Sequence, residues 1–427
     1  MWDRNEWRIF LLFFILFIFF TKTYPISPND RARLAGIQSV VENRTFAMDH
    51  SMFDSIDKVK IGEHFYSEKP VMSYLVFVPI YAVLYNQGIT FANKLSGVYY
   101  LLTLLVLGLS TSIMLVYFYR FLGRYGLSPA VRFFFTFALG VGTAIFPYAT
   151  VINNHALAAA FLFLSFYAAL SSKNAWQYAG AGLLAGLTAT FDIATGPIFL
   201  VVFSIWLLWR RIGLRKLLAY GAGASIPIAA YLLVNYVVSG SIIPFTLHSA
   251  YFNYPGSSFA NGAGVAGQAA FDMARTTKYL WDITFGVKGL FIFNPLLLFS
   301  VAGLIITIAY KRRYRAEAIF MALGIVSTIA FFVTKTDNWG GCNYGFRYTV
   351  PIIPILFAYT PAVFKRHKVP ALWMLFTIGL ALSVFISMMG LVQHPWGCTN
   401  WEMIPNQPFT ELMHRFFQQI TIPSHLF

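Results

Sequence analysis

The sequence predicts an all-α polytopic membrane protein with about eleven transmembrane helices. Of its 427 residues, 58% are hydrophobic and only 11% are charged, whereas charged residues make up about 25% of a typical soluble domain. The apolar residues gather in repeated runs that short polar segments separate. This composition excludes a soluble globular protein and a disordered chain, and two cysteines are too few for a disulfide scaffold.

Apolar runs long enough to cross a bilayer define the predicted spans. A helix needs about 20 residues to cross the hydrocarbon core, or somewhat fewer where the bilayer adapts. The predicted spans are 7–24, 97–119, 133–151, 155–171, 177–191, 193–209, 217–238, 290–310, 316–333, 348–364 and 371–392. No small-x-small cleavage site follows the first run, so we expect it to remain as an anchor.

The apolar run 71–85 decides the orientation of the chain. It contains Pro79 and would form a helix of only about 22 Å, which is too short for a span. If it does not span and the N-terminus is cytoplasmic, more than half of the 31 Lys and Arg residues fall on cytoplasmic loops. If it did span, the later basic loops would face outward, against the positive-inside rule. We therefore expect 71–85 to lie in the outer interface, and we attribute the net charge of +15 to topology rather than to nucleic-acid binding.

In this topology the longer loops of a single transmembrane domain (1–427) fall outside, in the periplasm or the extracellular space of a multi-pass cell-membrane protein. These loops are the first external loop 25–96 with its interfacial helices, the loop 239–288 with a Gly- and Ser-rich stretch that could act as a lid, the Trp/Gly/Arg loop 334–347 and the C-terminal tail 393–427. They hold most of the acidic residues. Cys342 and Cys398 also fall there, where a disulfide and two unpaired thiols are equally compatible with the sequence.

The first external loop places an acid and a base near the membrane surface. Asp30 follows the first span by a short turn, and Glu68-Lys69-Pro70 precedes the interfacial run. A carboxylate at such a cleft can act as general base on a hydroxyl, and Lys69 can meet a phosphate. The alternative for Asp30 is a cap on the helix that begins at Arg31.

The loop 334–347 combines glycines, aromatic residues and one cation. Trp339 and Tyr344 offer flat surfaces of the kind that sugars and lipid headgroups use, and Asn343 lies beside them. Arg347 falls at the outer mouth of the tenth predicted span, where a guanidinium suits the phosphate of a lipid carrier. The alternative is an arginine that snorkels to the interface.

Four more residues fall on the same outer face. His155 begins the fourth predicted span, and Asp192 interrupts the hairpin that the next two spans form. His248 and Tyr251 could line a substrate groove in the loop 239–288. The alternatives are a hydrogen-bonded packing role for His155 and a helix cap for Asp192.

These residues resemble the GT-C class of polytopic glycosyltransferases, of the protein mannosyltransferase and aminoarabinose transferase type. Asp30 matches an acid early in the first external loop of that class, and Ser67-Glu-Lys-Pro70 matches a Lys-Pro pair before its juxtamembrane helices. The motifs that also match are Tyr119-Arg120, the Gly-rich run 181–192 and Trp339-Gly-Gly to Gly345-Phe-Arg347. The chain departs from the class where the Gly-rich run ends in Asp192 rather than Lys, and it lacks both an acidic pair at 150–155 and a large C-terminal soluble domain.

The resemblance implies inverting transfer of a sugar from a polyprenyl-phosphate-linked donor to a hydroxyl acceptor at the outer face of the membrane. Asp30 would deprotonate the acceptor, and Lys69 and Arg347 would neutralise the phosphate leaving group. The substrate-binding candidates are Glu68, His155, Trp339, Asn343, Tyr344, His248 and Tyr251. No metal or cofactor is expected besides the donor, since the sequence has no HExxH, CxxC pair, EF-hand or P-loop. The expected partners are a lipid-linked sugar donor and a glycan, lipid or protein acceptor.

The main alternative function is a transporter or flippase for a lipid-linked substrate. Such proteins often show internal repeats and ionisable groups at mid-membrane. No convincing repeat is present here, and the ionisable residues gather at the predicted outer face. The sequence lacks the metal cluster that a phosphoethanolamine transferase would need and a clear nucleophile for an acyltransferase. A purely structural scaffold would leave Asp30, Lys69 and Arg347 unexplained.

Overall fold

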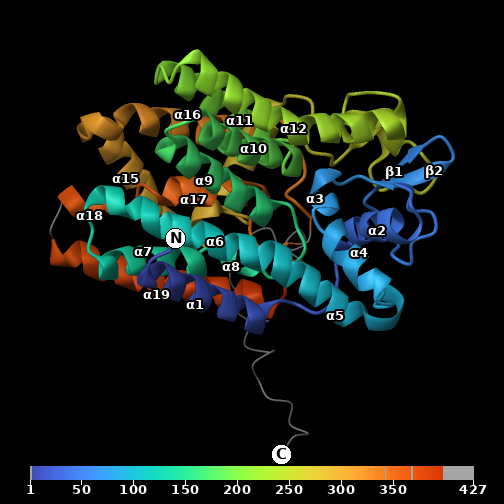
Figure 1. Ribbon diagram of the computed structural model, residues 1–427, viewed down its shortest axis with the longest axis horizontal. Coiled ribbons are helices and arrows are strands. Elements are labelled where there is room, and N and C mark those ends of the chain that lie inside the picture. Colours follow the sequence, from blue (N-terminus) through green and yellow to red (C-terminus); the bar gives the residue numbers. More distant parts are fainter. Residues whose placement is uncertain (1, 342, 367–368, 398–427) are drawn as a thin grey trace, which may run out of the picture.

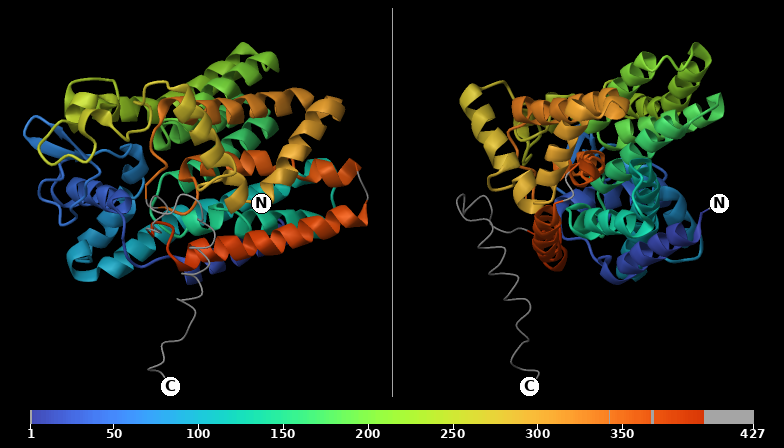
Figure 2. Two further views of the ribbon diagram at one scale, coloured as in Figure 1. Left: turned by 180° about the vertical axis from the view of Figure 1, so that it is seen from behind. Right: turned by 90° about the vertical axis from the view of Figure 1, so that its left-hand side faces the viewer.

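The computed structural model describes residues 2–341, 343–366 and 369–397, which fold into long helices that run side by side (Figure 1). The first external loop and residues 240–262 lie together at one end of these helices, as Figure 1 and the left view of Figure 2 show. Cys342, Cys398 and residues 398–427 of the predicted C-terminal tail lie outside the described residues. The prediction of a mostly helical chain is confirmed, and its membrane topology is considered below.

The N-terminal half of the chain holds the first eleven α-helices and the two strands. They are α1 (Arg4–Phe20), α2 (Pro28–Glu42), β1 (Lys58–Ile61), β2 (His64–Ser67), α3 (Met72–Leu75), α4 (Val78–Asn86), α5 (Phe91–Thr103), the π-helix η1 (Leu104–Gly108), α6 (Leu109–Leu122), the 3-10 helix η2 (Gly123–Tyr125), α7 (Pro129–Val141), α8 (Ile145–Tyr148), α9 (His155–Ser171), α10 (Ala175–Phe191) and α11 (Thr195–Trp209).

The rest of the described chain is helical apart from its loops. Its elements are α12 (Leu214–Ser239), the 3-10 helices η3 (Phe245–Leu247), η4 (Ser249–Phe252) and η5 (Ala260–Gly262), α13 (Met273–Thr284), α14 (Leu290–Phe293), α15 (Leu297–Tyr310), α16 (Arg312–Lys335), the 3-10 helix η6 (Arg347–Ile352), α17 (Ile353–Phe357), α18 (Pro361–Arg366) and α19 (Pro370–Val392).

Every predicted span overlaps a helical segment of the structure. By length and composition, five of these helical segments could cross a membrane: Phe91–Tyr125, Leu214–Ser239, Arg312–Lys335, Arg347–Phe364 and Pro370–Val392. Four more apolar helices, α7, α9, α11 and α15, are shorter than 18 residues. The apolar helices therefore indicate a membrane protein, while the number of eleven spans stays a prediction.

Large apolar side chains cover much of the outside of the helices. Leu208 on α11, Leu233 on α12 and Val326 on α16 are 56%, 62% and 62% exposed. Such a surface would be unstable in water over so many helices, whereas a lipid bilayer accommodates it. The outward-facing apolar residues therefore agree with the predicted class.

The first external loop is less uniformly helical than expected. The run 71–85 is helical but broken into α3 and α4, which fits the prediction that it is no single span. Strands β1 and β2 form an antiparallel hairpin, with Ile61 paired to His64 and Gly62 at φ +61° in the turn. This hairpin was not among the predicted elements, although Lys58-Val-Lys-Ile61 alternates polar and apolar residues as a half-buried strand does.

The Gly-rich run of α10 serves helix packing. A Cβ atom at Gly182 would lie 1.9 Å from the carbonyl oxygen of Tyr220 on α12, and one at Gly223 would lie 1.9 Å from that of Ala179 on α10. Glycines on both helices thus let the two backbones touch, as small residues do between membrane helices. This contact holds the hairpin that ends in Asp192 against α12.

The helices α9, α10 and α11 have two chemically different ends. His155 begins α9, and Asp192 lies between α10 and α11, at the end where the first external loop packs. The opposite end carries the basic loops that join α6 to α7 and α11 to α12, together with the start of α16. The structure therefore separates the predicted outer and inner faces along the helix axes, while their orientation in a membrane stays a prediction.

Candidate functional site

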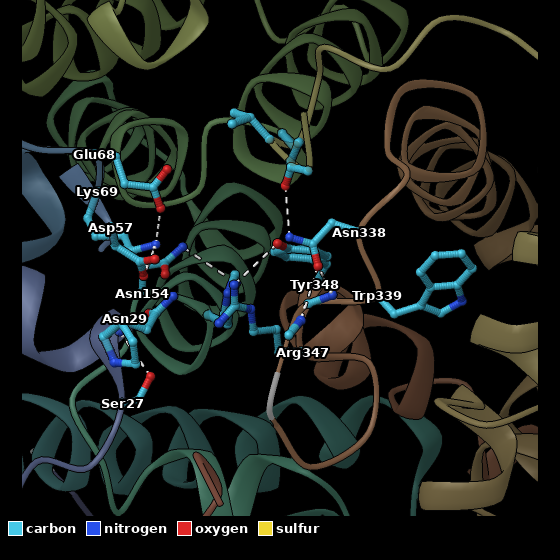
Figure 3. A pocket seen from close by; sticks show the side chains of 18 of the residues that line it. Ser27, Asn29, Asp57, Glu68, Lys69, Asn154, Asn338, Trp339, Arg347 and Tyr348 are labelled. Carbon is cyan, nitrogen blue, oxygen red and sulfur yellow. Dashed lines mark hydrogen bonds and ion pairs between the residues drawn. The ribbon is translucent and has the colours of Figure 1, made fainter. Parts of the chain in front are cut away.

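A cavity of about 870 Å³ lies between the first external loop, the start of α9 and the loop that precedes η6. Figure 3 shows that Asp57, Glu68 and Lys69 gather on one side of it, while Arg347 and Tyr348 lie on another. Residues of the segment 259–288 also line the cavity. The cavity thus collects side chains from segments that are far apart in the sequence.

Lys69 joins two carboxylates on the wall of the cavity. Its Nζ lies 2.8 Å from Oδ2 of Asp57 and also pairs with Glu68, and all three side chains are largely buried. The Ser55 hydroxyl donates to the Pro28 carbonyl at 2.7 Å and accepts from the Asp57 N–H at 3.1 Å, which fixes Asp57 next to the start of α2. Two acids against one ammonium make this side of the cavity net negative, so the charge of Lys69 is already offset.

Arg33 is a fully buried cation on the first turns of α2. It donates to the carbonyl oxygen of Asn29 at 2.8 Å and also bonds the side-chain oxygens of Asn29 and Asn154. Burial, together with the nearby Arg347, lowers the pKa of Arg33 to about 10, which leaves it charged at neutral pH. Its Nε atom is buried without a hydrogen-bond partner in the described structure.

Arg347 is the second buried cation. Its guanidinium donates a hydrogen bond to the Tyr348 hydroxyl at 3.2 Å, and it lies 5.0 Å from the ring of Tyr348 and 5.2 Å from that of Trp396. Among the described residues, neither Arg33 nor Arg347 has a carboxylate oxygen within 4.0 Å. Two buried guanidiniums without such partners line the cavity, and their N–H donors suit an anion although acidic side chains line the cavity as well.

His155 and Asp192 form a buried pair beside the guanidiniums. His155 Nδ1 lies 3.0 Å from Asp192 Oδ2, and its ring packs edge-on against Tyr348 at 5.4 Å. The other oxygen of Asp192 accepts from the Thr195 N–H at 3.0 Å and from the Ala194 N–H at 3.3 Å. The structure therefore agrees with the helix-cap interpretation of Asp192, and it adds His155 as the second partner of that carboxylate.

Lys288 and α13 hold the loop that precedes Arg347. Lys288 Nζ donates to the backbone and side-chain oxygens of Asn343 at 2.7 and 2.8 Å. Trp339 Nε1 donates to Asp282 Oδ2 at 3.1 Å, and Lys278 Nζ reaches the same oxygen at 2.5 Å. Trp339 thus lines the cavity with its indole N–H fixed, as a stacking surface requires.

Five of the predicted site residues line the cavity together: Glu68, Lys69, His155, Trp339 and Arg347. Asn343 and Tyr344 are buried behind it, where Asn343 accepts from Lys288 and the Tyr344 hydroxyl donates to the Ile386 carbonyl at 3.0 Å. His248 and Tyr251 stack on each other at 5.0 Å and are not among the lining residues. These four positions therefore belong to the support of the site or lie beside it.

The structure places Asp30 in a helix cap instead of on the cavity wall. Its carboxylate accepts from the Ser27 N–H at 3.0 Å and the Ile26 N–H at 3.3 Å, while the Ser27 side chain caps α2 in return. The side chain is fully buried, and Asp30 does not line the cavity. Burial raises the pKa of Asp30 to about 7 despite these hydrogen bonds. The structure therefore agrees with the helix-cap alternative for Asp30, and its role as a general base on an acceptor hydroxyl stays a prediction.

Two lining residues were missed as site candidates from the sequence. Arg33 lies four residues after Asn29, so both fall on one face of α2, and this spacing is a signal that the sequence does carry. Asp57 gives no such signal, since it is one of several acids between residues 49 and 68. Within the described residues no group of three or more potential metal-ligating His, Cys, Asp or Glu residues is found, and the expectation of metal-free chemistry stays a prediction.

Comparisons with known proteins give no match among protein-family models or curated proteins. Among solved structures, the chain is similar to the Archaeoglobus fulgidus oligosaccharyltransferase in its apo form, with 12% identity and a TM-score of 0.49. It is also similar to the oligosaccharyltransferase AglB from the same organism in complex with an inhibitory peptide and a dolichol-phosphate, with 12% identity and a TM-score of 0.48. Each alignment covers 98% of this chain and 60% of the other, so the chain spans about 60% of those proteins. The residues that line the cavity therefore carry the functional interpretation.

Proposed function

We propose that this chain is a glycosyltransferase that moves a sugar from a polyprenyl-phosphate donor to a hydroxyl acceptor at the outer face of a cell membrane, with inversion at the anomeric carbon. The observation that carries the proposal is the pair of buried guanidiniums, Arg33 and Arg347, which face a cavity that also holds carboxylates. Anion-binding cations next to a candidate base are what such a transfer needs. The GT-C-like motifs that contain Lys69 and Arg347 support the same class.

The two arginines are the proposed binding site for the donor phosphate. The phosphate oxygens would neutralise the two guanidinium charges, which have no carboxylate oxygen within 4.0 Å among the described residues. A guanidinium offers several N–H donors in a planar fork that matches phosphate oxygens. In this proposal Lys69 contributes less to phosphate binding than expected from the sequence, because its ammonium group is paired with Asp57 and Glu68.

Asp57 is the proposed general base in place of Asp30. In the proposed step, its carboxylate takes the proton of the acceptor hydroxyl while the hydroxyl oxygen attacks the anomeric carbon. The bond from that carbon to the phosphate oxygen breaks, and the phosphate leaves with the electron pair and stays bound to Arg33 and Arg347. Glu68 shares Lys69 with Asp57 and would orient the acceptor, and Trp339 would stack on a sugar ring.

The test compares two aspartates of the same loop. Membranes that contain the full chain receive a labelled pool of polyprenyl-phosphate sugars, and transfer of label to a new product is measured. Asp57→Asn should lower the rate by about 100-fold or more, as loss of a general base does. Asp54→Asn is the matched control, since the Asp54 side chain is 92% exposed and pairs only with Lys58. It should leave the rate unchanged.

Three results would contradict the proposal in different ways. If Asp30→Asn abolishes transfer and Asp57→Asn does not, the base is misassigned but the reaction class stands. If the folded wild type transfers no sugar and instead moves intact donor lipid between leaflets, the chain is a flippase. If no lipid-linked sugar binds at all, the proposed donor class is wrong.

A further inference from the structure

A second cavity, of about 470 Å³, lies at the opposite ends of the same helices. Helix α9 begins at the first cavity with His155 and ends at the second with Ser171. Its 17 residues separate the two by about 25 Å at 1.5 Å per residue. The second cavity is therefore a separate site, and an inference about it does not depend on the proposed sugar transfer.

The second cavity has more cations than anions in its wall. Five arginines line it, Arg120, Arg124, Arg210, Arg312 and Arg313, against the single acid Glu317. Glu317 is committed to Arg124 through two hydrogen bonds of 2.7 Å, and Glu6 from α1 binds Arg120. In the part of the chain that the structure describes, Arg210, Arg312 and Arg313 have no carboxylate oxygen within 4.0 Å. Three positive charges therefore remain available for an anion.

Aromatic rings contact two of these three cations, Arg210 and Arg313. The Arg210 guanidinium lies 5.0 Å from the ring of the buried Trp206, and one of its nitrogens donates to the Ala169 carbonyl at 2.8 Å. The ring of Tyr314 lies 4.2 Å from the guanidinium of Arg124 and 5.5 Å from that of Arg313. These contacts restrict the side chains before any ligand binds, which lowers the entropy cost of binding.

An apolar surface continues from the rim of the cavity along two helices. On α11, Trp209 and Ile205 are 60% and 50% exposed, and on α16, Leu323 and Val326 are 51% and 62% exposed. The two helices lie side by side, with the rings of Trp209 and Phe320 6.1 Å apart. A ligand with a charged head and an apolar tail would therefore meet complementary surfaces at both ends.

We propose that this second cavity binds the phosphate headgroup of an anionic phospholipid, whose acyl chains lie along the exposed faces of α11 and α16. Arg210, Arg312 and Arg313 bind the phosphate oxygens through charge-assisted hydrogen bonds. A free phosphate would satisfy the same cations but leave the adjoining apolar faces unused. The lipid is therefore the favoured source of the anion.

The test measures lipid binding to the full chain in detergent. Native mass spectrometry counts phosphatidylglycerol adducts in a titration, with phosphatidylcholine as the zwitterionic reference and inorganic phosphate as a competitor. The variant Arg210→Gln/Arg312→Gln/Arg313→Gln should bind phosphatidylglycerol about tenfold more weakly or worse, because it removes the three cations that would meet the phosphate oxygens. The control Lys173→Gln/Arg211→Gln/Arg215→Gln removes the same charge from exposed residues at that end that do not line the cavity. It should keep wild-type affinity.

A second variant controls for misfolding of the triple variant. Arg312→Gln/Arg313→Gln leaves the Arg210 bond to Ala169 intact and should still weaken phosphatidylglycerol binding measurably. Equal weakening in the exposed-residue control would mean that general surface charge attracts the lipid, and the cavity assignment would be overturned. Binding of inorganic phosphate without binding of phosphatidylglycerol would overturn the lipid assignment in favour of a free anion.

Discussion

Replacing an arginine by methionine should destabilise this protein at one end of its helices and leave its stability nearly unchanged at the other. Arg347 and Arg124 are both packed into the helices, but only Arg124 has a carboxylate partner among the described residues. The comparison of Arg347→Met with Arg124→Met therefore isolates the effect of an unmatched buried charge.

The expected magnitudes follow from the contacts of each side chain. Within the described residues, Arg124→Met leaves the buried Glu317 with one side-chain hydrogen bond, from the Tyr359 hydroxyl at 3.4 Å. Breaking a buried pair in this way costs about 3 kcal/mol. Arg347→Met loses one bond to Tyr348 and two cation–π contacts, together about 2 kcal/mol, and it also removes the desolvation cost of a buried guanidinium, which offsets part of that loss. The free energy of unfolding of Arg347→Met should thus stay within about 1 kcal/mol of the wild type.

The same two variants test the proposed donor-phosphate site when polyprenyl phosphate is added. Polyprenyl phosphate at about 100 times its Kd should stabilise the wild type and Arg124→Met by about 2.7 kcal/mol. It should not stabilise Arg347→Met, whose transfer rate should fall about 100-fold. The assay is thermal unfolding of the purified chain in detergent, followed by tryptophan fluorescence with and without the lipid.

The reasoning would be refuted if Arg347→Met destabilised the fold as much as Arg124→Met while keeping the full lipid-induced shift. Arg347 would then be a structural residue with a partner that makes it indispensable to folding. A loss of the lipid shift in both variants would instead indicate that the lipid senses the general state of the fold.

Two further predictions concern stability. Because burial raises the pKa of Asp30 to about 7, the folded chain holds this proton more tightly than the unfolded chain, and stability should fall by about 3 kcal/mol as the pH rises from about 4 to 7. Asp30→Asn should remove this slope in pH-dependent thermal unfolding, and an unchanged slope would assign it to other groups. Gly223→Ala should prevent the close approach of α12 to α10 and lower the yield of monodisperse protein, whereas Gly221→Ala on the same helix has open space and should behave as wild type. Equal yields would show that the contact is dispensable.

The class of the protein and the identity of its site-bearing segments could be predicted from the sequence. Apolar runs and basic loops depend only on composition along the chain, so each predicted span overlaps a helix. The same topology argument brought Glu68, Lys69, His155, Trp339 and Arg347 to one face, and the structure places them around one cavity. Once the order of the helices is known, the loops on one side of the membrane must lie together, whatever the details of side-chain packing.

Which polar side chains line the cavity, and which are paired with one another, was decided only by the tertiary structure. Asp30 and Asp57 are both acids of one loop, but helix α2 turns the oxygens of Asp30 onto its own N-terminal amides, while Lys69 holds Asp57 at the cavity. The charge of Lys69 is offset by its two neighbours, and that of Arg33 is not matched by a carboxylate within 4.0 Å in the described chain. These differences depend on distances between groups that the sequence separates by tens of residues. Local pattern therefore determines where the helices and the polar face form, and only packing determines which charges are left unmatched and available to a ligand.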